Sequence, residues 1–212
     1  MSTPRSGSAL QNGGAKVLAL LLVLVASTAY AQNNADDTKT LIEVLQLQPG
    51  QVVAEVGAGG GELTLAIGKH LGPEGRFFTS ELGAERLAKL RGVVDKSGLS
   101  HVQVVEGQET HANLADGCCD AIFMRNVYHH FSDPATMNAS FVRALKPGAR
   151  LAVIDFPPRN DAATAAPGKR GDTAAHGVSA ETVANELKAA GLTIVSTEER
   201  PNRWFLVVAQ KP

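Results

Sequence analysis

Three glycines directly behind a short apolar run are the residues with the clearest potential for ligand chemistry. The run from Gln51 to Val56 leads into Gly57, Gly59 and Gly61, and a helical pattern begins behind them. Glycine has no Cβ, so its backbone takes positive φ angles easily and can approach a bound molecule closely. The first turn of the following helix leaves backbone N–H groups without helical partners. We therefore expect this turn to bind a ligand.

The spacing of these glycines separates two kinds of nucleotide site. The dinucleotide pattern Gly-x-Gly-x-x-Gly needs its third glycine where this chain has Glu62, whose carboxylate would lie close to a pyrophosphate. The third glycine at Gly61 instead resembles motif I of the class I S-adenosylmethionine-dependent methyltransferases, whose ligand carries no phosphate. Glu55 matches the acidic strand-end residue of that family, and Glu81 matches the acid that ends its second strand. The resemblance covers nearly the whole chain after residue 31.

The resemblance implies S-adenosyl-L-methionine as the cofactor. Glu81 would accept hydrogen bonds from both ribose hydroxyls, and Leu82 would pack on the adenine. Gln108 or Glu109 would meet the adenine amino group, although the commonest family residue at position 108 is Asp. The expected cofactor-binding residues are Glu55, Gly57, Ala58, Gly59, Gly61, Glu81, Leu82, Gln108, Glu109 and Arg125.

A second group of reactive side chains follows the predicted fourth strand. Tyr128, His129 and His130 are consecutive and are the candidate catalytic residues, and His176 is expected on the same side. An imidazole suits proton removal from a methyl acceptor because its unperturbed pKa is near 6.5. The alternative is a turn in which Tyr128 packs and the histidines are simply solvated, with His176 only exposed.

The elements that must position these residues alternate between short apolar runs and amphipathic helices. We expect strands at 51–56, 76–80, 101–106, 120–124, 150–155, 192–197 and 203–209, and helices at 36–47, 62–71, 83–96, 133–146 and 179–190. The link at Pro201 and Asn202 is too short for a parallel crossover, so the last two strands form an antiparallel hairpin. The fold class is α/β: a Rossmann-like, doubly wound sheet of seven strands, mostly parallel with an antiparallel last strand.

The segment from Phe156 to Gly177 has no helical or strand periodicity and is rich in Pro, Gly, Ala and Asp. Aperiodic segments of this length are uncommon in compact domains and are usually functional or disordered. Because it follows the fifth strand, it starts at the edge where the cofactor is expected. We predict that it forms a lid over an acceptor pocket.

Composition limits the choice of partners. The 212 residues carry a formal net charge of −1 and 44% hydrophobic residues, which suits one domain with a full core and gives no basic footprint for nucleic acid. The two cysteines, Cys118 and Cys119, are neighbours whose bridge would be strained, so no ordinary disulfide is expected. No His or Cys stands at metal-ligand spacing, so no metal is predicted. The oligomeric state is left open.

The first 31 residues differ in kind from the rest. Arg5 and Lys16 precede the apolar run from Val17 to Ala26, and Ala29-Tyr30-Ala31 has the small-x-small pattern of a cleavage site. These features indicate a secretory signal peptide over residues 1–31 and a methyltransferase domain over 32–212, exported and periplasmic. The alternative is an uncleaved anchor in the inner membrane at residues 17–31, which would be the only membrane contact.

Two hypotheses of different class follow. The first is an enzyme that moves a methyl group by in-line displacement to a small-molecule acceptor, or less readily to a protein side chain. The second is a non-catalytic module of methyltransferase fold that binds a nucleoside or S-adenosylmethionine outside the cytoplasm. A nicotinamide-dependent oxidoreductase is disfavoured by Glu62 and by the terminal hairpin.

Overall fold

The computed structural model describes residues 34–159, 162–171 and 175–212. The predicted signal peptide at 1–31 and the alternative anchor at 17–31 lie outside these residues. The chain divides into two units, Met1–Asp37 and Thr38–Pro212, and the fold described below is that of the second unit. Among the helices that the structure describes, none is long and apolar enough to cross a membrane.

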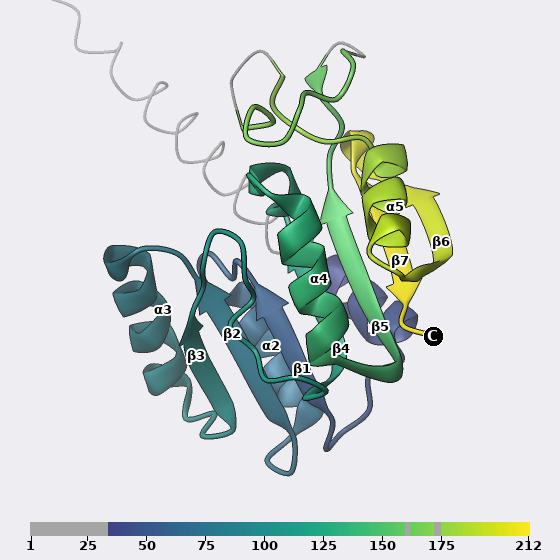
Figure 1. Ribbon diagram of the computed structural model, residues 1–212. Helices are drawn as coiled ribbons and strands as arrows, with labels where there is room; N and C mark the ends of the chain where they lie inside the picture. Colours follow the sequence, from purple (N-terminus) through teal and green to yellow (C-terminus); the bar gives the residue numbers. More distant parts are fainter. Residues whose placement is uncertain (1–33, 160–161, 172–174) are drawn as a thin grey trace, which may run out of the picture. The chain divides into compact units, whose positions relative to one another are not determined.

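Seven strands form one sheet in the order β3-β2-β1-β4-β5-β7-β6 (Figure 1). Their bounds are Val52–Val56 (β1), Arg76–Glu81 (β2), Val102–Glu106 (β3), Cys119–Arg125 (β4), Leu145–Asp155 (β5), Thr193–Glu199 (β6) and Phe205–Gln210 (β7). The pairs among β1 to β5 are parallel, whereas β7 runs antiparallel to both β5 and β6. The predicted sheet with a reversed last strand is confirmed.

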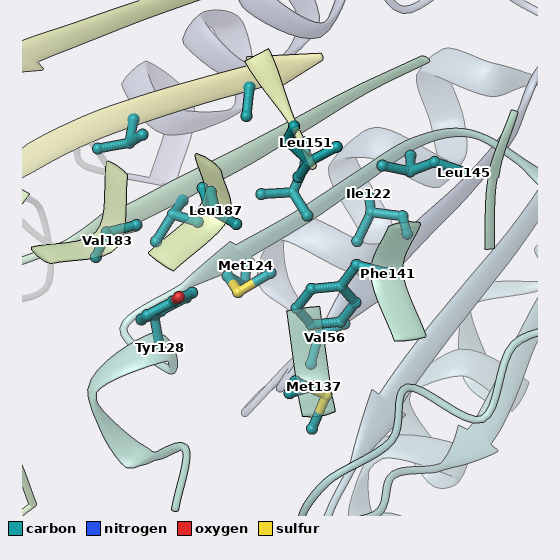
Figure 2. Packing of buried hydrophobic residues seen from close by; sticks show 14 of the residues in the cluster. Val56, Ile122, Met124, Tyr128, Met137, Phe141, Leu145, Leu151, Val183 and Leu187 are labelled. Carbon is teal, nitrogen blue, oxygen red and sulfur yellow. The ribbon is translucent and has the colours of Figure 1, made fainter. Parts of the chain in front are cut away.

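Helices cover both faces of this sheet. They are α2 (Glu62–Leu71), α3 (Ala84–Ser97), α4 (Pro134–Ala144) and α5 (Ala180–Ala189), with short 3-10 turns at Tyr128–His130 (η1) and Pro201–Arg203 (η3). Side chains of α4 and α5 pack into one buried cluster, which Figure 2 shows around Phe141 and Leu187. Side chains of α2, α3 and the helical residues 38–45 form a second cluster on the other face.

The central strand β4 shows how the sequence builds this three-layer arrangement. Ile122 and Met124 belong to the cluster under α4 and α5, and Ala121 and Phe123 to the opposite one. Successive strand residues point to opposite faces, so a continuous apolar run suits a strand that is buried on both sides. Burying each large side chain contributes about 1.5–3 kcal/mol. The carboxyl end of β4 is thereby fixed beside that of β1.

The largest difference from the predicted boundaries is at the start of β5. The strand predicted from Arg150 begins at Leu145, and α4 ends at Ala144. Lys146, Pro147 and Gly148 belong to β5, and the pairing register of β5 with β4 shifts between Cys119 and Ala121. An irregular extended segment of this kind accommodates a proline that an uninterrupted ladder would exclude.

The cysteine expectation also needs correction. Cys118 and Cys119 are joined by a disulfide, and the described residues contain no free cysteine. Their Cα atoms are 3.8 Å apart, as in any trans-linked pair of neighbours. The bridge therefore closes within a single dipeptide at the start of β4, where Gly117 turns the chain with a φ of 61°. It joins no distant parts of the chain.

Candidate active site

The glycine turn lies between β1 and α2, at the carboxyl edge of the sheet. Gly57 has a φ of 72°, and a Cβ there would lie 2.4 Å from Cγ2 of Val127. Only glycine permits this close approach, which brings the segment after β4 against the turn. Gly61, with a φ of 86°, precedes the first residue of α2. The turn is thus the predicted strand-to-helix corner, with Val127 as its neighbour.

Glu81, the last residue of β2, lies against this turn. Its Oε1 accepts a hydrogen bond of 2.9 Å from the Gly59 N–H, and its Oε2 accepts one of 2.8 Å from the Leu82 N–H. The Nε atom of Arg86 is 3.6 Å from Oε2. Leu82 is exposed, and a Cβ built on Gly59 meets no atom within 4 Å. A fixed carboxylate next to an exposed apolar side chain and open space suits a ligand with hydroxyls and an apolar ring.

Glu55 has a different environment from Glu81. It is buried, and its Oε2 accepts hydrogen bonds of 2.5 Å from Thr64 and 3.3 Å from Thr79. Burial raises its pKa to about 7, because the loss of hydration outweighs the two hydroxyl donors and the nearby charge of Arg125. Glu55 therefore links the end of β1 to Thr64 of α2 and Thr79 of β2, and it is inaccessible to solvent.

Glu62 lies on the solvent side of the same turn. It is exposed, and a Cβ built on Gly60 would lie 2.5 Å from its Oε1. The carboxylate is therefore beside the glycine backbone, where a pyrophosphate would otherwise bind. Like charges at this separation repel, so the geometry disfavours a dinucleotide.

The residues expected at the adenine are less constrained. Gly107 donates its N–H to the Glu81 carbonyl over 2.9 Å, which places the end of β3 beside that of β2. Gln108 and Glu109 follow it and are exposed. Arg125 is half-buried at the end of β4. The structure brings Gln108 and Glu109 to the predicted edge without assigning either one a partner.

Two buried side chains, His129 after β4 and Asp155 at the end of β5, form a pair. The Nδ1 atom of His129 is 2.9 Å from Oδ1 of Asp155. Asp155 also accepts the His129 and Phe156 backbone N–H groups over 3.2 and 2.9 Å. Because a carboxylate only accepts, His129 donates from Nδ1 and keeps a lone pair on Nε2.

That lone pair is directed at the loop after β5. The Nε2 atoms of His129 and His176 are 3.1 Å apart, and the Phe156 ring packs against both imidazoles. The His130 ring packs against His129 with centroids 3.9 Å apart and ring planes tilted by 46°. Burial and the neighbouring imidazoles lower the pKa values of His130 and His176 below the usual 6.5. Three of the chain's six histidines therefore meet here.

Tyr128, the third candidate catalytic residue, has a separate set of partners. It is fully buried among the apolar side chains shown in Figure 2. Its hydroxyl donates to Oε2 of Glu186 over 2.9 Å and accepts from Nδ2 of Asn138 over 2.7 Å. Burial and the Glu186 charge raise its pKa, so the phenol keeps its proton. These contacts give Tyr128 a structural role between α4 and α5.

Glu186 also holds the loop 156–177 to α5. Its two carboxylate oxygens accept from Arg170 over 2.5 and 3.1 Å, and Arg170 is 2% exposed. The carbonyl of Arg170 accepts from the Gly177 N–H over 2.9 Å. This paired contact fixes the part of the loop next to His176. Figure 1 shows the described residues of this loop, 156–159, 162–171 and 175–177, beyond the upper end of β5.

Three residues of this arrangement were not identified as functional from the sequence. Asp155 is the last residue of the strand predicted at 150–155 but is given no role there, and the ion pair of Arg170 with Glu186 is not predicted. One signal was available for Asp155: an acid directly follows the apolar run 151–154 at the edge of the sheet that carries the site. The loop gave no such signal, because its contacts are long-range and it has no periodicity.

Comparisons with known proteins agree with this geometry. Residues 54–153 match a family model described as a methyltransferase domain. The chain is 30% identical over 119 residues to the ubiquinone/menaquinone biosynthesis C-methyltransferase UbiE of Teredinibacter turnerae, covering 56% of this chain and 48% of the relative. It is 29% identical over 187 residues to phosphoethanolamine N-methyltransferase 1 of Zea mays, covering 84% of this chain and 35% of the relative. The chain thus spans less than half of either relative.

A solved structure extends the likeness to most of the fold. The S-adenosylmethionine-dependent methyltransferase of Aquifex aeolicus superposes with a TM-score of 0.71 at 26% identity, covering 83% of this chain and 90% of that one. Together with the glycine turn and Glu81, these findings support a class I S-adenosylmethionine-dependent methyltransferase.

Proposed function

We propose that this protein transfers a methyl group from S-adenosylmethionine to a protic small-molecule acceptor, with His176 as the base. The carrying observation is the hydrogen-bonded chain Asp155–His129–His176, which reaches the sheet edge that also holds the glycine turn. The acceptors in the names of both relatives are small molecules, which supports this acceptor class.

The residues at the glycine turn fit the cofactor. Glu81 would bind the ribose hydroxyls with a carboxylate that is already oriented by the Gly59 and Leu82 N–H groups. Leu82, 39% exposed, would cover one face of the adenine. Glu55 would hold the turn through Thr64 instead of touching the ligand. Bound S-adenosylmethionine supplies an electrophilic methyl group on a sulfonium, open to in-line displacement.

The histidine chain would prepare the acceptor. His129 donates from Nδ1 to Asp155, so its Nε2 accepts the Nε2–H of His176. This tautomer leaves Nδ1 of His176 with a lone pair that an acceptor O–H or N–H can reach. Proton removal by a positioned base contributes about 10²–10⁴ in rate. Asp155 and His129 are then positioning residues, and His176 is the base.

The loop that carries His176 would close the acceptor side. Its residues include Gly171, where a Cβ would lie 3.3 Å from Nδ1 of His130. The loop therefore packs over the histidines, while Arg170 anchors it to α5. Active-site loops of this kind exclude water and position the acceptor. Positioning alone can supply about 7–11 kcal/mol of the barrier reduction.

The second candidate is a non-catalytic module that binds S-adenosylmethionine or a nucleoside. It shares the glycine turn and Glu81 with the enzyme but has no use for an oriented histidine chain. The buried His129–Asp155 pair favours the enzyme. Burying polar groups costs free energy unless they are paired, and the non-catalytic module has no use for a buried histidine held in this way.

The test uses the full chain with methyl-labelled S-adenosylmethionine and acceptors that carry hydroxyl, amine or activated carbon groups. S-adenosylhomocysteine that forms only with an acceptor indicates transfer. His176→Ala should remove most turnover and leave cofactor affinity unchanged, whereas His111→Ala, outside the cluster, should change neither. Tight cofactor binding without turnover on any acceptor class would favour the non-catalytic module.

A further inference from the structure

We infer that His129, His130 and His176 form a binding site for one divalent transition-metal ion. One ligating nitrogen from each imidazole can be chosen so that all three lie within 4.8 Å of one another. No sequence spacing indicates this site, because His129 and His130 are adjacent in the chain and His176 comes from the loop after β5. The inference concerns metal binding itself and does not depend on methyl transfer.

The distance between Nε2 of His129 and Nε2 of His176 suits two ligands of the same metal ion. Zn–N bonds are about 2.0–2.1 Å, so two nitrogens on a tetrahedral ion are about 3.3 Å apart. The Nε2 atoms of His129 and His176 are 3.1 Å apart. An ion could therefore replace the proton that these two atoms share, with little movement of either ring.

His129 has the support that metal-bound histidines usually have. Its Nδ1 is held by Asp155 at 2.9 Å, and both side chains are 0% exposed. A carboxylate on the far nitrogen fixes the tautomer, directs the Nε2 lone pair at the metal and strengthens the ligand. Nε2 of His176, which donates its proton to that lone pair in the metal-free protein, already faces it. His129 is thus oriented as a ligand before any ion binds.

The other two ligands can adapt to the ion. His130 is exposed and His176 is half-buried, so both rings can move by the small distance that closes the triangle. The fourth coordination position would face the exposed side, where water or a donor atom of an acceptor can bind. Three protein ligands with one open position are typical of a reactive zinc site, in contrast to a closed structural one.

The ligand set selects the metal class. Three neutral imidazoles suit Zn²⁺, Cu²⁺, Ni²⁺ or Fe²⁺ and not Mg²⁺ or Ca²⁺, which prefer oxygen ligands. Metal binding also competes with the proposed proton chain, because both use Nε2 of His129 and of His176. A loaded site would therefore have no shared proton between these two residues.

The site is tested by titrating the metal-stripped full chain with Zn²⁺ in a calorimeter, without reductant so that the Cys118–Cys119 disulfide stays closed. We expect one ion per chain and a dissociation constant in the micromolar range or below. His176→Ala and His130→Ala should each weaken binding at least tenfold, and Asp155→Asn should weaken it about 10- to 100-fold. His111→Ala is the matched control and should leave the constant unchanged.

Two further readouts keep the test independent of folding defects. Co²⁺ in place of Zn²⁺ should give the strong visible bands of a tetrahedral ion in the wild type and lose them in His176→Ala. Circular dichroism should show that this variant is folded. The inference is overturned if the wild type binds no Zn²⁺, or if His176→Ala binds it as tightly as the wild type does.

Discussion

Nδ1 of His129 lies 2.9 Å from Oδ1 of Asp155, and neither side chain is exposed to solvent. One residue follows β4 and the other ends β5, so two parallel neighbours in the sheet bring them together. The same edge carries the glycine turn and Glu81. The position of the proposed chemistry is therefore set by the sheet, and the loop 156–177 completes it.

Asp155→Asn should lower turnover and leave cofactor affinity unchanged. Asparagine can donate to Nδ1 of His129 through its amide, which would favour the tautomer with the proton on Nε2. The hydrogen bond to His176 would then reverse and leave the proton of His176 on Nδ1, the atom proposed to act as base. We expect a loss of about 10²–10⁴ in kcat, the usual contribution of an oriented base. Steady-state kinetics with calorimetric cofactor titration would measure both. Unchanged kcat in a folded variant would remove Asp155 from the mechanism.

Glu55 should make folding stability depend on pH. Burial raises its pKa to about 7 in the folded protein, against 4.5 for an ordinary glutamate side chain. Below pH 4.5 both states are protonated. Between 4.5 and 7 only the unfolded state releases the proton, so the free energy of unfolding falls as pH rises. At about 1.4 kcal/mol per pKa unit, the fall amounts to about 3 kcal/mol.

Glu55→Gln removes this charge but keeps an acceptor for Thr64 and Thr79. Arg125 and Glu62, the charged groups that act on Glu55, are unchanged in the variant. Urea unfolding from pH 4 to 8 should show the stability of the variant relative to wild type increasing between pH 4.5 and 7. Parallel pH profiles for the two proteins would show that Glu55 ionises normally in the fold.

Arg170→Met should loosen the loop and destabilise the domain. Arg170 pairs with Glu186, and the loss of one partner leaves a charge near the hydroxyl of Tyr128. Breaking a buried ion pair costs about 3–5 kcal/mol, and we expect the low end because the Glu186 side chain is 23% exposed. Urea unfolding and limited proteolysis of the loop measure the two effects. Arg159→Met, at an exposed position of the same loop, is the control, and equal behaviour of the two variants would contradict the anchoring role.

Removal of residues 1–31 on export is proposed from the sequence alone. Arg5, Lys16, the apolar run after Lys16 and Ala29-Tyr30-Ala31 motivate it. Mass spectrometry of the protein from a cell-envelope fraction should find a mature N-terminus at Gln32. An intact chain in that fraction would instead favour the uncleaved anchor at residues 17–31.

The sheet could be predicted from the sequence because its signals are local. Alternating apolar runs and helices give the parallel core, and the short link at Pro201–Asn202 forces the reversal of β7. The glycine turn and Glu81 were also local, since each follows directly from a strand end. The largest displacement was at the start of β5, which begins at Leu145 and includes Pro147 and Gly148.

The histidine cluster could not be predicted, because it depends on contacts between distant segments. His176 reaches His129 only through the path of an aperiodic loop, which Arg170 fixes by an ion pair with α5. Tyr128 was grouped with the histidines from adjacency alone. The 3-10 turn directs its ring into the core and the His129 ring toward Asp155, so neighbours in sequence have different environments.

The central claim is that S-adenosylmethionine binds at the glycine turn through Glu81. It is tested most directly by calorimetric titration of the wild type, Glu81→Ala and the control Glu85→Ala, an exposed acid in the first turn of α3. Hydrogen bonds to a charged group contribute about 1.5–3 kcal/mol each, so Glu81→Ala should raise the dissociation constant at least tenfold while Glu85→Ala leaves it unchanged. An unchanged constant for folded Glu81→Ala, or no binding by the wild type, would contradict the account.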